Sequence, residues 1–136
     1  MQDRYLFRAK RLDNGQLVQG FICKKKYKSN KFYISCFHDK DDNEQFFAID
    51  PDTICQCTGL KDKNGKLIWE NDIMVAHLDE DYPEDETYIR ILWCGNGFCS
   101  IENGSKDIAQ IDKFDREHFE VCGNIFDNPE LLESEE

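Results

Sequence analysis

Residues 58–73 read TGLKDKNGKLIWENDI, and this stretch decides how the second half of the chain folds. Its centre is a charged turn that contains Asn64-Gly65, followed by the apolar run Leu67-Ile68-Trp69. Asn-Gly between two apolar runs is typical of a tight β-turn, because both residues tolerate a positive φ at little steric cost. The stretch therefore predicts a turn between strands.

Working outward from this turn, β-branched and aromatic residues alternate with polar residues along most of the chain, which favours strands. The predicted strands are residues 4–9, 16–23, 32–37, 45–49, 54–60, 73–78, 87–94, 98–101 and 119–126. The clearest hairpin turns on Gly95-Asn96-Gly97, and a second turns on Asp13-Asn14-Gly15. The pattern predicts a mostly β fold, built as a barrel or a sandwich.

Proline and capping residues mark where some of these elements end. Pro51 ends the strand before it, because proline cannot donate to a β-ladder. Asp127-Asn128-Pro129 offers a cap and a first-turn proline, so a short helix is predicted over residues 127–132. Residues 102–118 favour no single element, since Ile108 and Ile111 are their only apolar anchors before Phe114.

The composition is that of one ordinary domain. The chain has 136 residues, 40% hydrophobic and 33% charged, which is enough apolar content for a single core under a strongly charged surface. No apolar stretch approaches the ~20 residues of a membrane span, and the first residues, MQDRYLFRAKR, lack the features of a signal peptide. We therefore expect a cytoplasmic protein with no membrane partner, whose seven cysteines are reduced thiols.

The net charge of −11 is unevenly distributed along the sequence. Residues 1–40 hold ten Lys/Arg against three Asp/Glu, a local charge of +7, whereas the remainder holds seven against twenty-five, a local charge of −18. Such an acidic chain is not expected to bind nucleic acid in general, although a local basic strip could still contact phosphate.

Two stretches together resemble a known family. Residues 56–73, which include the opening turn, and residues 121–132, VCGNIFDNPELL, are similar to the YopX-like family of phage and prophage proteins, and Phe7-Arg8-Ala9 fits it as well. The chain departs from the family pattern at Cys57, where Tyr is usual, and at Asn71, where Gly is usual. Asn adopts the left-handed backbone more readily than most residues, so we expect Asn71 to preserve the turn.

The resemblance implies a mostly β (α+β) fold of antiparallel strands, with a small SH3-like barrel in the C-terminal part and a short C-terminal helix. We expect a single domain over residues 1–136, in which residues 1–50 form N-terminal hairpins, 51–132 hold the barrel and 133–136 are a frayed tail. The family has no established activity, so the resemblance implies a phage or prophage setting rather than a reaction.

The residues offer little support for an enzyme. Glu70 and Asp72 could act as an acid–base pair only if one were buried with a raised pKa, and their position before a strand suits backbone capping better. His38, His77 and His118 have no nucleophile motif beside them. Gly95-Asn96-Gly97 precedes a strand rather than a helix, so it does not predict a phosphate-binding loop.

The cysteines could form a metal site only if four ligands converged. Cys55 and Cys57 are expected on one face of a strand, and Cys94 and Cys99 are expected near each other across a turn. Their spacings lack the usual Cys-x2-Cys pattern, so we interpret them as small apolar or free thiol side chains and predict no metal and no cofactor.

Two charged segments remain as candidate binding sites. One is a basic strip interleaved with aromatics, which could contact phosphate and stack bases, or could be a solvated strand edge: Lys24, Lys25, Lys26, Tyr27, Lys28 and Lys31. The other is an acidic run in a predicted mobile loop, which could dock on a basic protein surface or mimic DNA, or could be merely solvated: Asp79, Glu80, Asp81, Glu84, Asp85 and Glu86.

The sequence thus predicts a protein that acts by binding. The leading hypothesis is a non-enzymatic accessory module that engages an unknown host or phage protein, and association of copies through a strand edge is a further expectation. The alternative is a nucleic-acid-binding accessory factor that uses the basic strip at residues 24–33.

Overall fold

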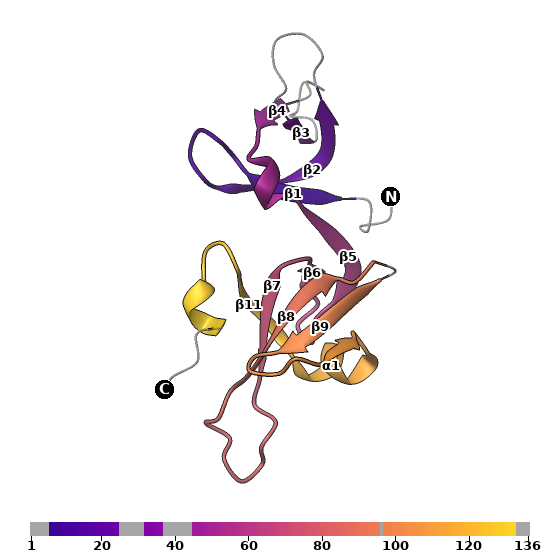
Figure 1. Cartoon of the computed structure of the whole chain (residues 1–136), viewed down its shortest axis with the longest axis vertical. Helices are drawn as coiled ribbons and strands as arrows, with labels where there is room; N and C mark the ends of the chain where they lie inside the picture. Colours follow the sequence, from indigo (N-terminus) through magenta and orange to yellow (C-terminus); the bar gives the residue numbers. More distant parts are fainter. Residues whose placement is uncertain (1–5, 25–31, 37–44, 96, 133–136) are drawn as a thin grey trace. The chain divides into compact units, whose positions relative to one another are not determined.

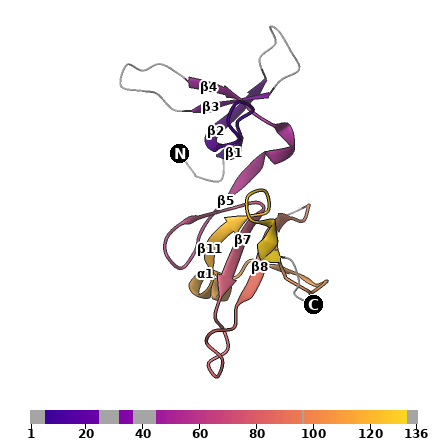
Figure 2. The same cartoon turned by 90° about the vertical axis from the view of Figure 1, so that its left-hand side faces the viewer.

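The computed structural model describes residues 6–24, 32–36, 45–95 and 97–132, and these form two compact units, Met1–Cys57 and Thr58–Glu136. Almost every regular element is an antiparallel β-strand, as the sequence predicts (Figures 1 and 2). The elements of the first unit are β1 (Phe7–Lys10), β2 (Leu17–Lys24), β3 (Phe32–Cys36), β4 (Gln45–Ala48) and η2 (Pro51–Thr53). β5 (Cys55–Lys61) begins in the first unit and ends in the second.

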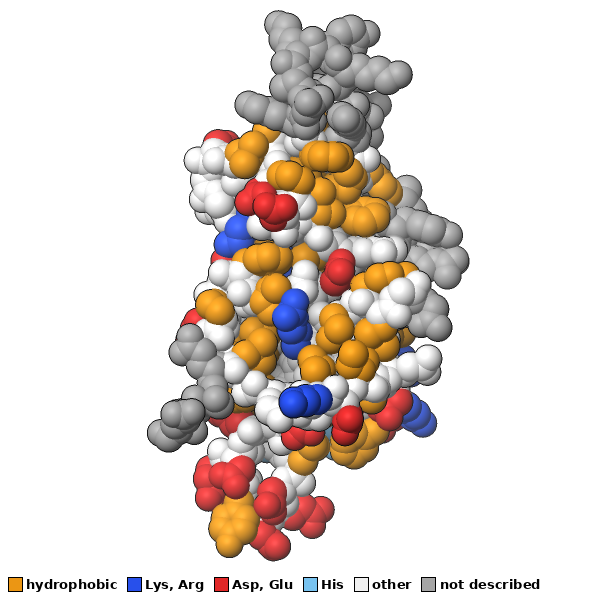
Figure 3. Space-filling view, viewed as in Figure 1, with side chains coloured by type: hydrophobic (Ala, Val, Ile, Leu, Met, Phe, Trp, Pro, Cys, Tyr) orange, Lys and Arg blue, Asp and Glu red, His pale blue; other side chains and the backbone are white. Residues whose placement is uncertain are grey.

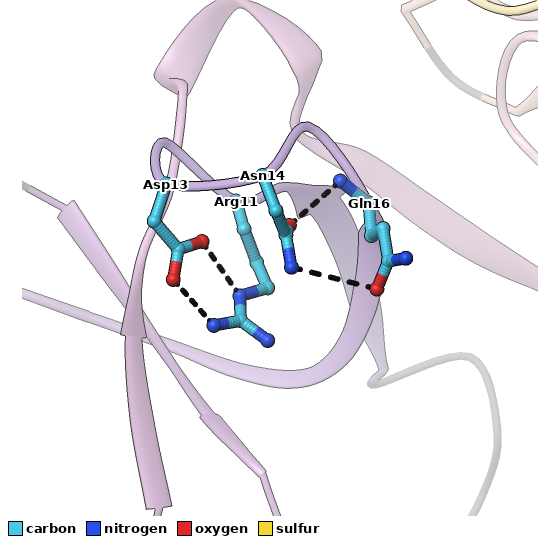
Figure 4. A network of polar contacts seen from close by, with 4 residues as sticks. All are labelled: Arg11, Asp13, Asn14 and Gln16. Atoms are coloured by element: carbon cyan, nitrogen blue, oxygen red, sulfur yellow. Dashed lines mark hydrogen bonds and ion pairs between the residues drawn. The ribbon is translucent and has the colours of Figure 1, made fainter.

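In the first unit the strands follow the order β4-β3-β2-β1-β5. The predicted turn at Asp13-Asn14-Gly15 joins β1 to β2, and Gly15 takes a positive φ of 71° there. Arg11 holds this turn by donating to both carboxylate oxygens of Asp13, at 2.8 and 2.5 Å (Figure 4). The Gln16 backbone N–H donates to Asn14 Oδ1 at 2.9 Å, so short polar side chains shape the loop as local hydrogen-bonding partners.

A small core fills the first unit. Ala9, Ile34 and Ile49 are fully or almost fully buried, and partly buried apolar residues pack against them: Val18, Ile22, Phe32, Phe47 and Ile54. The Arg11 guanidinium lies over the Phe47 ring at 4.1 Å from its centroid. Pro51 ends the preceding strand as predicted, because Asp50 caps a single 3-10 turn there.

All elements that follow β5 in the sequence lie in the second unit. They are β6 (Leu67–Trp69), β7 (Asp72–Ala76), β8 (Thr87–Trp93), β9 (Phe98–Glu102), β10 (Ile108–Gln110), α1 (Lys113–His118), β11 (Glu120–Asn124) and η3 (Pro129–Leu132). Five of its strands form a sheet in the order β10-β9-β8-β7-β11. The predicted Gly95-Asn96-Gly97 hairpin is confirmed, because β8 pairs with β9 on either side of it.

The core of the second unit lies on one face of this sheet. It consists of Ile68, Met74, Ala76, Ile89, Ile91 and Phe119. All five residues of β7 are buried, so this strand anchors the sheet between β8 and β11.

Two details of the second unit go beyond the sequence pattern. Residues 102–118, which favoured no single element, form β10 and α1, and a reciprocal capping box between Asp112 and Asp115 starts the helix. Residues 129–132 form a single 3-10 turn where a short helix was predicted. The SH3-like barrel expected for this half stays a prediction, since the described strands form sheets without a closed barrel.

Candidate functional site

The charged turn quoted at the outset is built around the Asp62 carboxylate. Asp62 is only 6% exposed, and its Oδ1 accepts hydrogen bonds from the backbone N–H groups of Asn64 and Lys66, each at 2.9 Å. Its Oδ2 accepts from the backbone N–H of Val121 at 2.8 Å. One buried side chain therefore shapes the turn after β5 and binds it to β11.

Asn71 and Asp72, in the Glu70-Asn71-Asp72 group, also organise backbone. Asp72 is 1% exposed, and its Oδ2 accepts from the Trp69 backbone N–H at 2.8 Å. Asn71 has a φ of 69°, which confirms the predicted left-handed turn. Its side chain accepts a hydrogen bond from Arg90 Nη2 at 3.1 Å, an interaction that a glycine at this position could not make. Asp72 thus caps backbone, as the sequence suggested, and the group that it caps is the Trp69 N–H.

The closing stretch at residues 121–132 is held in the same way. Asn124 is 7% exposed, and its Oδ1 accepts from the backbone N–H groups of Phe126 and Asp127, each at 3.0 Å. The Ile125 N–H donates to the Asn71 carbonyl at 3.0 Å. The two stretches that carry the family resemblance therefore contact each other, and their polar residues stabilise the fold.

The cysteines and histidines do not converge on a reactive centre in the part of the chain that the structure describes. Cys55 and Cys57 are fully buried, and no group of three or more His, Cys, Asp or Glu side chains in the described ranges could hold a metal ion. The Cys94 and Cys99 thiols lie near each other as predicted, and their hydrogen bond raises the pKa of Cys94 above its ordinary value. His77 is exposed, and His118 stacks on Phe114, whereas His38 lies outside the described residues.

The predicted acidic loop joins β7 to β8, and each of its residues from Asp79 to Glu86 is exposed. Figure 3 shows its red side chains gathered at the lower end of the view, with an apolar side chain among them. Tyr82, at the middle of this segment, is 58% exposed. The loop thus presents six carboxylates around an aromatic side chain.

Hydrogen bonds shape this loop locally. Asp79 Oδ1 accepts from the backbone N–H groups of Asp81 at 2.9 Å and Tyr82 at 3.3 Å, and the Asp85 N–H donates to the Tyr82 carbonyl at 2.9 Å. The Tyr88 hydroxyl donates to the Glu86 carboxylate, and this hydrogen bond raises the pKa of Tyr88 to about 12. The carboxylates therefore project from a turn of defined shape.

Most of the basic strip lies outside the part of the chain that the structure describes. Lys25, Lys26, Tyr27, Lys28 and Lys31 lie outside the described residues, and Lys24 is described only as the last residue of β2. The nucleic-acid hypothesis for these residues therefore stays a prediction from the sequence.

Sequence reasoning missed further acidic side chains in the second unit. Asp107, Asp112 and Asp115 lie between β9 and the middle of α1, in the segment to which no element was assigned. The available signal was an Asp at each end of Asp112-x-x-Asp115, a spacing close to the capping-box pattern that begins helices. Together with the loop, these residues give the second unit twenty Asp/Glu against seven Lys/Arg.

This geometry defines the class of the protein: a β-rich chain whose characteristic motifs stabilise its fold and whose second unit carries a shaped acidic surface. The family model described as YopX protein matches residues 6–133, and the chain belongs to that family.

Among solved structures, the chain is similar to protein EF1440 from Enterococcus faecalis. The two share 25% sequence identity and a TM-score of 0.55, and the likeness covers 93% of this chain and 96% of that one. No curated protein matches the sequence. Within the described ranges, no helix has the length and apolar character needed to cross a membrane.

Proposed function

We propose that this chain is a non-enzymatic accessory module of a phage or prophage, which engages a host or phage protein through the acidic loop at residues 79–86. The observation that carries the proposal is the arrangement of the loop itself, in which six exposed carboxylates surround the exposed ring of Tyr82. A loop whose only role is to connect β7 to β8 has no need for this concentration of one charge.

The physical chemistry of the loop suits a basic partner surface. A cluster of one charge steers an oppositely charged partner and accelerates encounter, while adding modestly to affinity. Tyrosine is enriched at binding hot spots, because its ring buries a large area and its hydroxyl can still find a hydrogen-bond partner. Tyr82 would therefore supply the anchor and the carboxylates would supply the orientation.

We infer in addition that the second unit is a small SH3-like barrel and that the protein acts in the cytoplasm. The family resemblance supports the first inference, and the antiparallel order of the five-stranded sheet is compatible with it. The expectation from the sequence that the cysteines are reduced thiols supports the second.

The test is a tagged pull-down from lysate of the cells that carry the gene, with half of the lysate treated with nuclease. The loop variant carries Glu80→Gln, Asp81→Asn, Glu84→Gln and Asp85→Asn, and leaves Asp79 and Glu86 in place because they shape the loop. The control variant carries Glu117→Gln and Glu130→Gln, which change exposed carboxylates outside the loop.

We expect a stoichiometric protein partner that survives nuclease and is retained by the control, but is lost from the loop variant and at high salt. A partner retained equally by the loop variant would refute the role of the loop. Recovery of nucleic acid, with protein partners lost on nuclease treatment, would favour the alternative at residues 24–33.

A further inference from the structure

A cavity of about 440 Å³ opens in the second unit between the strands β8, β9 and β10 and the helix α1. Its volume lies within the ~300–1,000 Å³ typical of ligand sites. Leu78 and Thr87, the residues next to the two ends of the acidic loop, also line it. The cavity is therefore continuous with the base of that loop.

The floor of the cavity is an extension of the core face of the sheet. Ile89 and Phe119, both core residues, line it. In the strand register Ile89 pairs with Glu102, and Ser100 pairs with both Ile91 and Ala109. Residues paired across antiparallel strands share a face, so the core side of the sheet continues outward as the cavity floor.

The walls of the cavity are acidic. Glu102, Asp107, Asp112 and Asp115 line it, and no Lys, Arg or His is among the described residues that do. Asp112 Oδ1 and Asp115 Oδ2 each accept one backbone N–H in the capping box of α1. Neither Glu102 nor Asp107 has an ion pair within the described part of the chain. The cavity therefore concentrates negative charge that no cation of the described residues neutralises.

The hydroxyl of a mostly buried residue also lines the cavity. Ser100 is 6% exposed, and its hydroxyl has no hydrogen-bond partner among the described residues. The hydroxyl oxygen keeps some accessible surface, since it is not one of the buried atoms that lack a partner, and it therefore faces the open space of the cavity. A ligand that enters the cavity can use this hydroxyl as a donor or an acceptor.

We propose that this cavity is the binding site for an arginine side chain on a linear segment of a partner protein. The apolar stem of arginine would pack against Ile89, Phe119 and Phe114, as such stems commonly do on apolar surface. Its guanidinium carries five donors, which suits a wall of carboxylate oxygens and the Ser100 hydroxyl better than a single ammonium does. The proposal rests on the proposed function, because it places the partner's contact beside the acidic loop.

The test begins with selection from a random library of short linear peptides displayed on phage, against the biotinylated full-length chain. Ala109→Phe serves as counter-selection bait, because Ala109 is exposed and a phenyl ring there would fill the cavity. A second variant, Glu102→Gln with Asp107→Asn, removes charge from exposed wall residues and leaves the α1 cap intact. Amide NMR spectra of both variants verify folding, and the charge variant carries the test if Ala109→Phe does not fold.

We expect enriched peptides that contain arginine beside an apolar residue and that shift the amide signals of Ile89, Ser100 and Ala109. Replacing their arginine by glutamine, or using the charge variant, weakens binding about tenfold, while Glu117→Gln does not change it. The proposal is overturned if no peptide is enriched, if the enriched peptides lack arginine, or if they bind both cavity variants as tightly as the natural chain.

Failure of this inference is distinguishable from failure of the proposed function. If the pull-down partner is lost from the loop variant but retained by both cavity variants, the loop acts alone and the arginine site is wrong. If arginine peptides bind the cavity while no protein partner depends on the loop, the site is correct and the proposed role of the loop is wrong.

Discussion

At the scale of single residues, charged and polar side chains of the family motifs act on the backbone. Asp62 accepts three backbone hydrogen bonds, Asp72 accepts one from Trp69, and Asn124 accepts two. Each of these side chains is buried, and the hydrogen bonds to them are buried or partly buried, which limits competition from water. Asp72, one of the two carboxylates considered as an acid–base pair, therefore caps backbone instead.

Asp62 gives the sharpest stability prediction. We expect Asp62→Ala to lower the free energy of unfolding by about 3 kcal/mol, because hydrogen bonds to a charged group are strong and three backbone N–H groups lose their acceptor. Urea denaturation of the natural chain and the variant measures the difference. Glu130→Ala, at an exposed carboxylate, should change stability by less than ~0.5 kcal/mol. An effect of Asp62→Ala as small as this would contradict the connecting role.

At the scale of elements, most strands could be predicted from the sequence because β-branched and aromatic residues alternate between glycine-containing turns. The left-handed backbone at Asn71 could also be predicted, from the resemblance and from the conformational tolerance of Asn. β10 and α1 could not, since β10 is exposed throughout and α1 contains no buried residue. Elements of so few residues, with no apolar periodicity, are recognised only from their caps and from the strand they pair with.

The candidate site, too, could be predicted only in part from the sequence. The acidic run at 79–86 is evident in the composition, but the cavity is formed by residues from three strands and a helix whose proximity depends on register. Ser100 illustrates the difficulty, because an isolated serine in an apolar strand carries no signal until its neighbours Ile91 and Ala109 are known.

Gly123, inside β11, and Gly97, just before β9, allow a matched pair of glycine substitutions. A Cβ on Gly123 would lie 2.5 Å from Asn128 Oδ1, whereas a Cβ on Gly97 would meet no atom within 4 Å. We expect Gly123→Ala to reduce stability by about 2 kcal/mol, since the Asn128 side chain must move and lose the hydrogen bond that it accepts from the Asn124 backbone N–H. Gly97→Ala should be nearly neutral by thermal unfolding, and equal effects of the two changes would contradict the close packing at Gly123.

The start of α1 predicts a pH dependence. Burial raises the pKa of Asp115 above its ordinary 3.8, and the charge of Asp112 adds to the effect. The folded state therefore binds more protons than the unfolded state between 3.8 and the raised pKa, so Asp115 makes stability fall as the pH rises through that window.

Asp112→Asn tests the cause of this shift, because Asn can still accept the Asp115 N–H while its charge is absent. We expect the pKa of Asp115, followed by carboxyl carbon NMR, to move toward its ordinary value without reaching it, since burial remains. An unchanged or higher pKa in the variant would show that the Asp112 charge plays no part.

At the scale of the whole molecule, the two units differ in charge and in core. The first carries ten Lys/Arg against eight Asp/Glu, whereas the second carries seven against twenty. The core of the first unit includes three buried apolar residues and that of the second includes six among those described. The excess of negative charge is thus a property of the second unit.

Hydrogen exchange should report the differences in strand pairing and exposure. We expect the slowest amides of the molecule in β7 and β8, which are paired on both edges, and fast exchange in the exposed β10 and in residues 79–86. The described strands of the first unit should exchange faster than β7. Protection of residues 79–86 equal to that of β7 would contradict the assignment of this loop to the solvated surface.

The contact between the two motif stretches has a consequence for synthesis of the protein. Asp62 reaches Val121 across 59 positions of sequence, and β7 completes its pairing only with β11. While the ribosome has not yet released β11, the second unit lacks the partner of its most buried strand, with apolar residues such as Ile73 and Met74 still open to other chains. The second unit can therefore close only after β11 has left the ribosome, which makes the nascent chain before that point, rather than the folded protein, the stage most exposed to aggregation and to chaperone capture.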